Sequence, residues 1–372
     1  MSKREWAEIR AEFPSLRGRT FLNTATFGQL PGRTKEAALA HLERREKAAA
    51  LDFLDWFDDL DKTRALVARL IHGSPDDIAF VPNAGYALAL AISAIAWQPG
   101  DELLTLQHEF PNQLYGHASV AARGVECDWP EFEAHVNDHT RLVALSTVNY
   151  TTGLRPDLSR LVKRLRERGI VVYLDGTQSA GALEFDFAAL APDFFAVDTY
   201  KWMISPNGAT FMAVHPEMRQ RLPPNALGWR SDKDWRNVTH LHHGAPRFGE
   251  TAEKYEPGML PFLSLCGMHA SLSLLDEIGI PRIEERVLEL AGMLRHELAA
   301  MGAEFYQSGG ECLPSQIVTA SLPGADSAAL AKSLAEQNIN ISARRAYLRI
   351  SPHFYNNEED IAALIRALRQ LK

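Results

Sequence analysis

The sequence predicts an α/β fold with a mostly parallel sheet in a large domain, followed by a smaller C-terminal α+β domain. Short β-branched and aromatic runs, typical of buried strands, alternate with helical patterns between residues 78 and 201. Such alternation indicates parallel strands joined by crossover helices. At 372 residues, the chain is also too long for one small core, so two domains are expected.

The composition excludes several classes of function. Apolar residues make up 46% of the chain, charged residues 23%, and the net charge of −8 argues against a nucleic-acid partner or an anionic membrane surface. The first ten residues are charged and lack the apolar core of a signal peptide, and the apolar stretch 86–97 is too short to span a membrane. A cytoplasmic location is therefore expected. The cysteines Cys127, Cys266 and Cys312 form no CxxC pair, so neither a disulfide framework nor a zinc framework is expected.

The N-terminal third combines an arm, two helices and one candidate anion site. Residues 1–20 are expected to form the arm, and residues 21–31 a short strand that runs into a polar loop containing Thr26. Helical spacing over residues 34–50 and 61–71 predicts packing and surface helices. A strand at 78–81 and a turn of small residues then lead into an alanine-rich helix. Because the first N–H groups of a helix have no internal partners, the backbone of Ala84 and Gly85 is a candidate phosphate site.

Two more strands, at residues 103–106 and 141–145, end in polar loops. The first loop carries His108 and Phe110. The ring of Phe110 could stack on an aromatic ligand, which would bury apolar surface and fix the tilt of that ligand. His108 could move protons, or it could be a solvated loop residue. The second loop carries Asn149.

An acid and a lysine follow the next two strands. The runs at residues 171–174 and 194–197 deliver Asp175 and Lys201 to the same edge of the sheet, where ligands bind in open α/β folds. Taken alone, Asp175 would be interpreted as an acid that starts a turn, and Lys201 as a solvated lysine beside a helix. Together they match the requirement of pyridoxal phosphate (PLP), a lysine for the Schiff base and an acid that keeps the pyridine nitrogen protonated. Gln178, one turn past Asp175, is positioned to donate to the phenolic oxygen of such a ring.

The segments around these residues resemble a known family. LDGTQSAG, and TYKW followed by NGATFMAV, resemble the cofactor-binding core of the class V aminotransferases, which are fold-type I PLP enzymes. Kynureninase, isopenicillin N epimerase, selenocysteine lyase and cysteine desulfurases belong to that family. Tyrosine before the lysine is closer to the kynureninase and epimerase branch than to the desulfurases, which have histidine there. The resemblance covers nearly the whole chain, and it implies a seven-stranded sheet and a homodimer with shared active sites.

The resemblance also implies roles for individual residues. Thr26 would lie over the active site close to the substrate, and Asn149 between the substrate and the phenolic oxygen. Phe110 takes the position of a kynureninase phenylalanine, where desulfurases have a histidine that can also move protons. Three residues are implied as phosphate contacts: Tyr200, Trp229, for which dimer packing is an equal alternative, and Thr251, which would act from the neighbouring subunit. The segment of Thr251 departs from the family pattern, because Gly249 stands where glutamate is usual.

The C-terminal part is expected to bind the substrate. Residues 208–214 are interpreted as an edge strand; long helices at 260–278 and 283–301, a strand at 316–321 and a helix at 327–337 follow. The resulting domains are 1–20, 21–246 and 247–372. The segment YLRISPHFYN resembles the family's R-x-S…Y-N segment, so Arg349 would pair with a substrate α-carboxylate. Arg344 and Arg345 could bind a second acidic group or form a solvated basic turn.

These features predict a PLP enzyme that acts on an amino acid or another amine, with Lys201 as the catalytic residue. Transamination is the nominal reaction; a carbon–carbon or carbon–sulfur lyase and an epimerase are alternatives, and a non-catalytic PLP-binding regulator is the alternative from another class. Residues 339–346 contain no cysteine, so the persulfide chemistry of a desulfurase is not expected.

Overall fold

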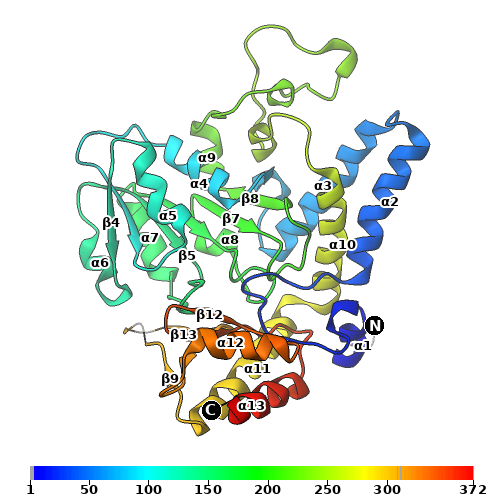
Figure 1. The fold of residues 1–372 in the computed structure, drawn as a ribbon. Helices are drawn as coiled ribbons and strands as arrows, with labels where there is room; N and C mark the ends of the chain where they lie inside the picture. The colour runs from blue at the N-terminus through cyan, green and yellow to red at the C-terminus, as the bar shows by residue number, and fades with distance from the viewer. Residues whose placement is uncertain (1–3, 308, 311, 372) are drawn as a thin grey trace.

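The computed structural model describes residues 4–307, 309–310 and 312–371, and its centre is a seven-stranded sheet (Figure 1). The strands lie in the order β2 (Ile78–Val81), β8 (Thr210–Val214), β7 (Phe194–Asp198), β6 (Val171–Asp175), β5 (Thr140–Ser146), β3 (Glu102–Leu106) and β4 (Arg123–Cys127). Strand β8 runs antiparallel to β2 and β7, and all the other strands of this sheet run in one direction. The mostly parallel seven-stranded sheet predicted from the sequence is thereby confirmed.

The expectation that residues 208–214 form an edge strand is wrong. Strand β8 pairs with both β2 and β7, and β2 and β4 are the edges. All five residues of β8 are buried, which suits a strand covered on both sides. A local apolar run does not encode which strands flank it, and for this reason the sequence pattern did not distinguish an interior strand from an edge.

Successive residues of the strands face two different cores. In β6, Val171 and Tyr173 face a core shared with α4 (Ala84–Ser93), whereas Val172 and Leu174 face a core shared with α7 (Ser159–Glu167) and α10 (Phe262–Ile278). This alternation is the period of two of a β-strand. Because both faces are covered, the sequences of the strands are continuous apolar runs. Polar residues follow at the carboxyl ends of the strands.

The remaining helices surround these layers. Helix α10 packs against α2 and α3, and Figure 1 shows these long helices side by side at one edge of the molecule. The helices not yet given bounds are α1 (Trp6–Ala11), α2 (Gly32–Ala48), α3 (Phe53–Leu70), α5 (Pro111–Tyr115), α6 (Phe132–His135), α8 (Phe187–Leu190), α9 (Pro216–Arg221), α11 (Ile280–Ala300), α12 (Ser327–Glu336) and α13 (Glu358–Leu371). Within the residues described, none of the helices combines the length and the apolar character needed to cross a membrane.

A small antiparallel sheet forms the C-terminal part of the molecule. Its order is β12 (Ser342–Arg344), β13 (Tyr347–Ile350), β10 (Val318–Ser321) and β9 (Glu304–Phe305). Helices α11, α12 and α13 share a separate apolar core with this sheet. The proposed domain boundaries stay a prediction.

The N-terminal segment joins the C-terminal part. Strand β1 (Thr20–Phe21) pairs in parallel with β11 (Ile339–Asn340), and Phe13 packs edge-on against Phe354 and at a tilt against Tyr355. A further bridge links Asn23 to Ser351. These contacts carry the loop after β1 across the carboxyl ends of the large sheet.

Candidate active site

Asp175 and Lys201 come together at the carboxyl end of the large sheet. Asp175 is the last residue of β6, in register with Ser146 of β5, and Lys201 follows β7 by three residues. The Lys201 side chain is buried, with Nζ 5.8 Å from the ring centre of Phe110 and 5.6 Å from that of Tyr200. Asp175 is close enough to act electrostatically on Lys201.

The surroundings make the Lys201 amine easier to deprotonate. Burial lowers the pKa of Lys201 to about 8, because a charged ammonium is poorly solvated there. Asp175 opposes this effect, whereas Arg349 and Arg344 add to it. The neutral amine, the form that attacks an aldehyde, is therefore more abundant near neutral pH than for an ordinary lysine, whose pKa is about 10.4.

Asp175 is an acid held between two amide donors. Burial raises its pKa; hydrogen bonds from Thr177 act in the opposite direction. The N–H of Thr177 donates to Oδ1 at 2.8 Å, and Nε2 of Gln113 donates to Oδ2 at 3.4 Å. The Oε1 atom of Gln113 is buried and has no hydrogen-bond partner among the residues described.

Sequence reasoning missed Glu109, a buried carboxylate in the loop that carries Phe110. It accepts hydrogen bonds from the N–H and Oγ of Ser146, at 2.7 and 2.6 Å. Burial raises the pKa of Glu109 to about 7, and the charge of Asp175 acts in the same direction. Gln113 also lies within 3.3 Å of Ser146 Oγ, which links Glu109 to Asp175 through neutral side chains. The available signal was an acidic residue in the loop that follows a buried strand.

An acid of the chain itself, Asp198, contacts the N-terminus of α4. The N–H of Ala84 donates to Oδ1 of Asp198 at 3.0 Å, and Thr210 Oγ1 donates to the same oxygen at 2.8 Å. Of the two backbone donors predicted to hold a phosphate, Ala84 thus has a partner within the chain. The N–H of Gly85 belongs to the same first turn, where helical N–H groups lack internal partners. Sequence reasoning did not identify Asp198 as a neighbour of this site.

Phe110 and Asn149 lie in two loops that are tied together. The Nδ2 of Asn149 donates to the carbonyl of His108 at 3.0 Å, and its Oδ1 accepts from the N–H groups of Thr151 and Thr152. The ring of Phe110 meets that of Tyr150 edge-on, with centroids 5.3 Å apart. Asn149 thus holds the Phe110 loop in place and keeps one amide N–H for a ligand.

Gln178 is similarly engaged. Its Nε2 donates to the carbonyl of Ala25 at 2.9 Å, and its Oε1 accepts from the indole N–H of Trp202 at 2.8 Å. These contacts connect the strand end of Asp175 to the loop after β1. One amide N–H of Gln178 is left for the predicted phenolic oxygen.

Arg349 is a buried cation that no carboxylate neutralises in the part of the chain the structure describes. Its guanidinium donates to the Tyr150 carbonyl at 2.7 Å, to Thr26 Oγ1 at 2.5 Å and to Ser342 Oγ at 3.0 Å. Burial, and then the charge of Arg344, lower the pKa of Arg349 to about 9. An unpaired buried charge is costly, so this arrangement favours an anionic ligand. Thr26 contacts the guanidinium directly, and its role next to a substrate stays a prediction.

Gly28 permits the loop after β1 to lie directly on Lys201. The N–H of Gly28 donates to the Tyr200 carbonyl at 2.9 Å, and a Cβ at this position would be 1.9 Å from the Lys201 carbonyl oxygen. Only glycine fits such a close approach of two backbones. The ring of Phe27 also packs on Tyr200, with centroids 4.8 Å apart.

Two predicted phosphate contacts have other surroundings in this chain. The ring contacts of Trp229 are with Phe57 and Trp235, at 6.3 and 5.5 Å between centroids. Thr251 precedes the short helix Ala252–Tyr255 and lines a pocket of about 810 Å³ with Arg219 and Lys254. Their roles toward a cofactor stay predictions.

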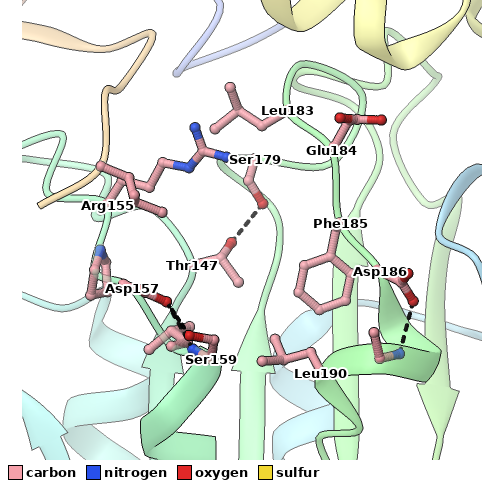
Figure 2. Close-up of a pocket in the computed structure, with 14 residues that line it drawn as sticks. Thr147, Arg155, Asp157, Ser159, Ser179, Leu183, Glu184, Phe185, Asp186 and Leu190 are labelled. Carbon is pink, nitrogen blue, oxygen red and sulfur yellow. Dashed lines mark hydrogen bonds between the residues drawn. The ribbon is translucent and has the colours of Figure 1, made fainter.

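Another pocket, of about 310 Å³, lies beside the strand ends (Figure 2). Three of its charged residues have partners within the chain: Arg155 pairs with Glu284, Asp157 accepts from Ser159, and Asp186 accepts from the N–H of Ala189. Figure 2 shows the hydrogen bond between Thr147 and Ser179, at 2.6 Å, within it. It contains none of the residues predicted to bind cofactor or substrate, so the chemistry is assigned to the Lys201 site.

Comparison with known proteins identifies the family. The family model for class V aminotransferases matches residues 54–364. The chain belongs to this family. It is 29% identical over 402 residues to isopenicillin N epimerase of Streptomyces clavuligerus, covering 100% of this chain and 99% of the epimerase. It is 24% identical over 370 residues to an uncharacterized aminotransferase of Bacillus subtilis, covering 95% of each.

Solved structures share the fold. A C-DES mutant with glycine covalently linked to its PLP cofactor has a TM-score of 0.85 at 22% identity, covering 96% of this chain and 98% of that one. Cysteine desulfurase CsdA of Escherichia coli also has a TM-score of 0.85 at 22% identity, covering 99% and 98%. Identity this low carries the architecture alone.

Three predictions are confirmed by the family and the fold. The chain has the fold-type I architecture, it is an enzyme of the transaminase or lyase kind, and class V aminotransferases use PLP as their cofactor.

Proposed function

We propose that this protein uses PLP to transform an amino acid, with transamination as the first candidate reaction. One observation carries the proposal. The buried Lys201, whose pKa is lowered to about 8, faces the buried Asp175, and the buried Arg349 lies nearby without a carboxylate partner among the residues described. A nucleophilic amine, an acid for a pyridine nitrogen and a cation for a carboxylate are the groups this chemistry requires.

The residues present fit the cofactor. Asp175 would hold the pyridine nitrogen, Phe110 would cover the ring, and the open amide N–H groups of Gln178 and Asn149 would serve the phenolic oxygen. Because Asp198 uses the N–H of Ala84, the proposed phosphate donor in the first turn of α4 is Gly85. Tyr200, Trp229 and, from the second subunit of a homodimer, Thr251 are the other proposed phosphate contacts. When bound, PLP supplies an electron sink for the pair left at the substrate α-carbon.

The chain's own residues would bind and orient the substrate. Arg349, with Thr26 beside it, would pair with the α-carboxylate and fix the direction of the α-carbon. The amine of Lys201 would then accept the α-proton at Nζ, which its lowered pKa allows near neutral pH. A cytoplasmic location is part of the same proposal.

Epimerisation is the second candidate, favoured by the full-length similarity to isopenicillin N epimerase. A carbon–carbon or carbon–sulfur lyase is the third. Desulfurase activity is not proposed, because β12 and β13 are joined at Arg345 and Ala346 and contain no cysteine. Cys312 lies on a different loop, bridged to Pro156.

The test mixes the holoenzyme with a panel of amino acids and follows its visible absorbance and the products. A keto acid together with an aminated cofactor indicates transamination, inversion at the α-carbon an epimerase, and a released side-chain fragment a lyase. Borohydride reduction should attach the cofactor to Lys201, and Lys201→Ala should lose the yellow colour. Labelling elsewhere would refute the assignment of Lys201. If the unmutated protein binds PLP through Lys201 but transforms no amino acid, a non-catalytic regulator replaces the proposal.

A further inference from the structure

The hairpin that carries Arg349 holds a second arginine, Arg344, close to the site. Strand β12 pairs with β13 so that Ser342 lies opposite Arg349 and Arg344 lies opposite Tyr347. Residues opposite each other, and residues two apart on one strand, point to the same face of a sheet. Arg344 and Arg349 therefore share a face as diagonal neighbours, roughly 7–8 Å apart at Cα.

This face is directed at Lys201. The Arg349 guanidinium reaches Thr26 and the Tyr150 carbonyl. The charge of Arg344 lowers the pKa values of both Lys201 and Arg349, so its guanidinium lies within electrostatic range of the two groups. Arg344 is half-buried, which places it at the border of the site.

Arg344 has no acid of its own. Its NH1 donates to the carbonyl of the preceding Ala343 at 2.9 Å, and it forms no ion pair with any carboxylate in the described part of the chain. Many arginines of this chain do have such partners; Arg64 and Arg230, for example, share Glu256. A half-buried guanidinium beside a second cation is unfavourable unless an anion joins them.

The tip of the hairpin closes against the Phe110 loop. Arg345, in the left-handed region at φ 55°, lies against the imidazole of His108, with NH2 2.7 Å from Nδ1. The acids that act electrostatically on His108 are Asp128 and Glu126. This contact ties the hairpin to the Phe110 loop and engages Arg345, so Arg344 and Arg349 are the two hairpin arginines on the face toward Lys201.

The charges of these two arginines indicate the class of substrate. A substrate with only an α-carboxylate neutralises Arg349 and leaves Arg344 unmatched. We propose that Arg344 binds a second acidic group, so the preferred substrates are amino acids with an anionic side chain. This inference rests on the proposed function, because it concerns the same substrate.

The test compares matched pairs of amino acids on the holoenzyme. L-aspartate is compared with L-asparagine, and L-glutamate with L-glutamine, and dissociation constants are read from the change in visible absorbance. The acid of at least one pair should bind at least about ten-fold more tightly than its amide, as expected for a charged hydrogen bond. The preference should shrink as ionic strength rises.

Variants separate a specific contact from general charge. Arg344→Gln should weaken the acid about ten-fold and leave its amide within about two-fold, while Arg344→Lys should keep part of the preference. Arg160→Gln, which removes an exposed arginine of α7, is the matched control and should change neither constant. Unchanged binding of the amide also shows that the Arg344→Gln site is folded.

Two results would overturn the inference and leave the proposed function intact. In one, acids and amides bind equally in both pairs; in the other, Arg344→Gln weakens both members of a pair to the same extent. If none of the four amino acids, nor any other in the wider panel, changes the spectrum, the proposed function fails as well. The two failures are therefore distinguishable.

Discussion

The ammonium of Lys201 is surrounded by groups that act on it in opposite directions. Burial and two arginines favour its neutral form, and two acids, Asp175 and Asp198, favour the charged form. The balance lowers its pKa to about 8, against about 10.4 for an ordinary lysine. Nucleophilic capture of an aldehyde depends on the neutral fraction, so this balance has a kinetic consequence.

We predict that capture of PLP by the cofactor-free protein accelerates up to a pH of about 8 and then levels off. Below that pH each unit should change the rate about ten-fold, because the neutral amine fraction changes by that factor. The measurement is stopped-flow absorbance over pH 6 to 10, with Lys201→Ala as the control that captures none. A rate still rising ten-fold per unit above pH 9 would contradict the lowered pKa.

A second prediction concerns Glu109. Its folded pKa of about 7 lies above the usual 4.5, so its contribution to stability is complete below pH 4.5 and is lost as the pH rises through about 7. The loss is about 3 kcal/mol. Glu109→Gln cannot ionise, so the Tm difference between unmutated protein and variant should be smaller at pH 8 than at pH 5.5. If the Tm difference between the two proteins is the same at pH 5.5 and at pH 8, Glu109 does not ionise between these pH values, and its raised pKa is contradicted.

Sequence reasoning found some of these residues and missed others for a physical reason. Asp175 and Lys201 could be predicted because each lies at or shortly after the end of a strand-like run, within a motif that resembles the family. Glu109 and Asp198 follow strands as well, but nothing local shows that one becomes buried against Ser146 and that the other contacts the N-terminus of α4. Burial and partners across the sheet depend on strand order, which a local pattern does not contain.

At the scale of elements, the loop after β1 and the β12–β13 hairpin meet at Arg349, the proposed substrate contact. Thr26 and Ser342 both accept hydrogen bonds from Arg349. The strands at the centre of the large sheet and the long helices α10 and α11 were predictable from apolar periodicity, since each is a local property, but the parallel strand β4 and the helix α13 were not predicted. The position of β8 inside the sheet was not, because strand order is set by long-range packing. Nor was the β12–β13 hairpin, because it closes at Arg345 in a left-handed conformation that carries no turn signature in the sequence.

Gly28→Ala should displace this loop. The new Cβ would collide with the Lys201 carbonyl, and relieving the clash moves Thr26 away from Arg349. We expect a cost of about 1–3 kcal/mol in stability, a lower Tm and weaker amino-acid binding. Calorimetry and spectral titration measure the two effects. Gly292→Ala, in open space on α11, is the control and should be neutral or slightly stabilising; equal behaviour of the two variants would refute the close approach at Gly28.

On the scale of the whole molecule, one buried ion cluster joins four segments that are far apart in the sequence. Glu256 is fully buried and binds Arg64 of α3, the N–H of Phe80 in β2, and Arg230. The charges of Arg64 and Arg230 help to hold the pKa of Glu256 below its usual value, against the effect of burial.

Glu256→Gln should be strongly destabilising, because two buried guanidinium groups lose their common anion. Breaking such a cluster costs about 3–5 kcal/mol, so the Tm should fall by several degrees. Glu253→Gln removes a more exposed partner of Arg230 and is the matched control with a smaller effect. Comparable losses in the two variants would show that burial of Glu256 contributes little.

The hydrogen bond between Thr26 and Arg349 joins residues that are 323 positions apart. A ribosome adding about 5–20 residues per second needs roughly 16–65 s to cover that interval. During synthesis the β1 segment and its loop emerge first and must stay soluble without the strand they will join. Arg349, the proposed partner of a substrate carboxylate, is thus added among the last residues, so a chain truncated before it would lack this contact.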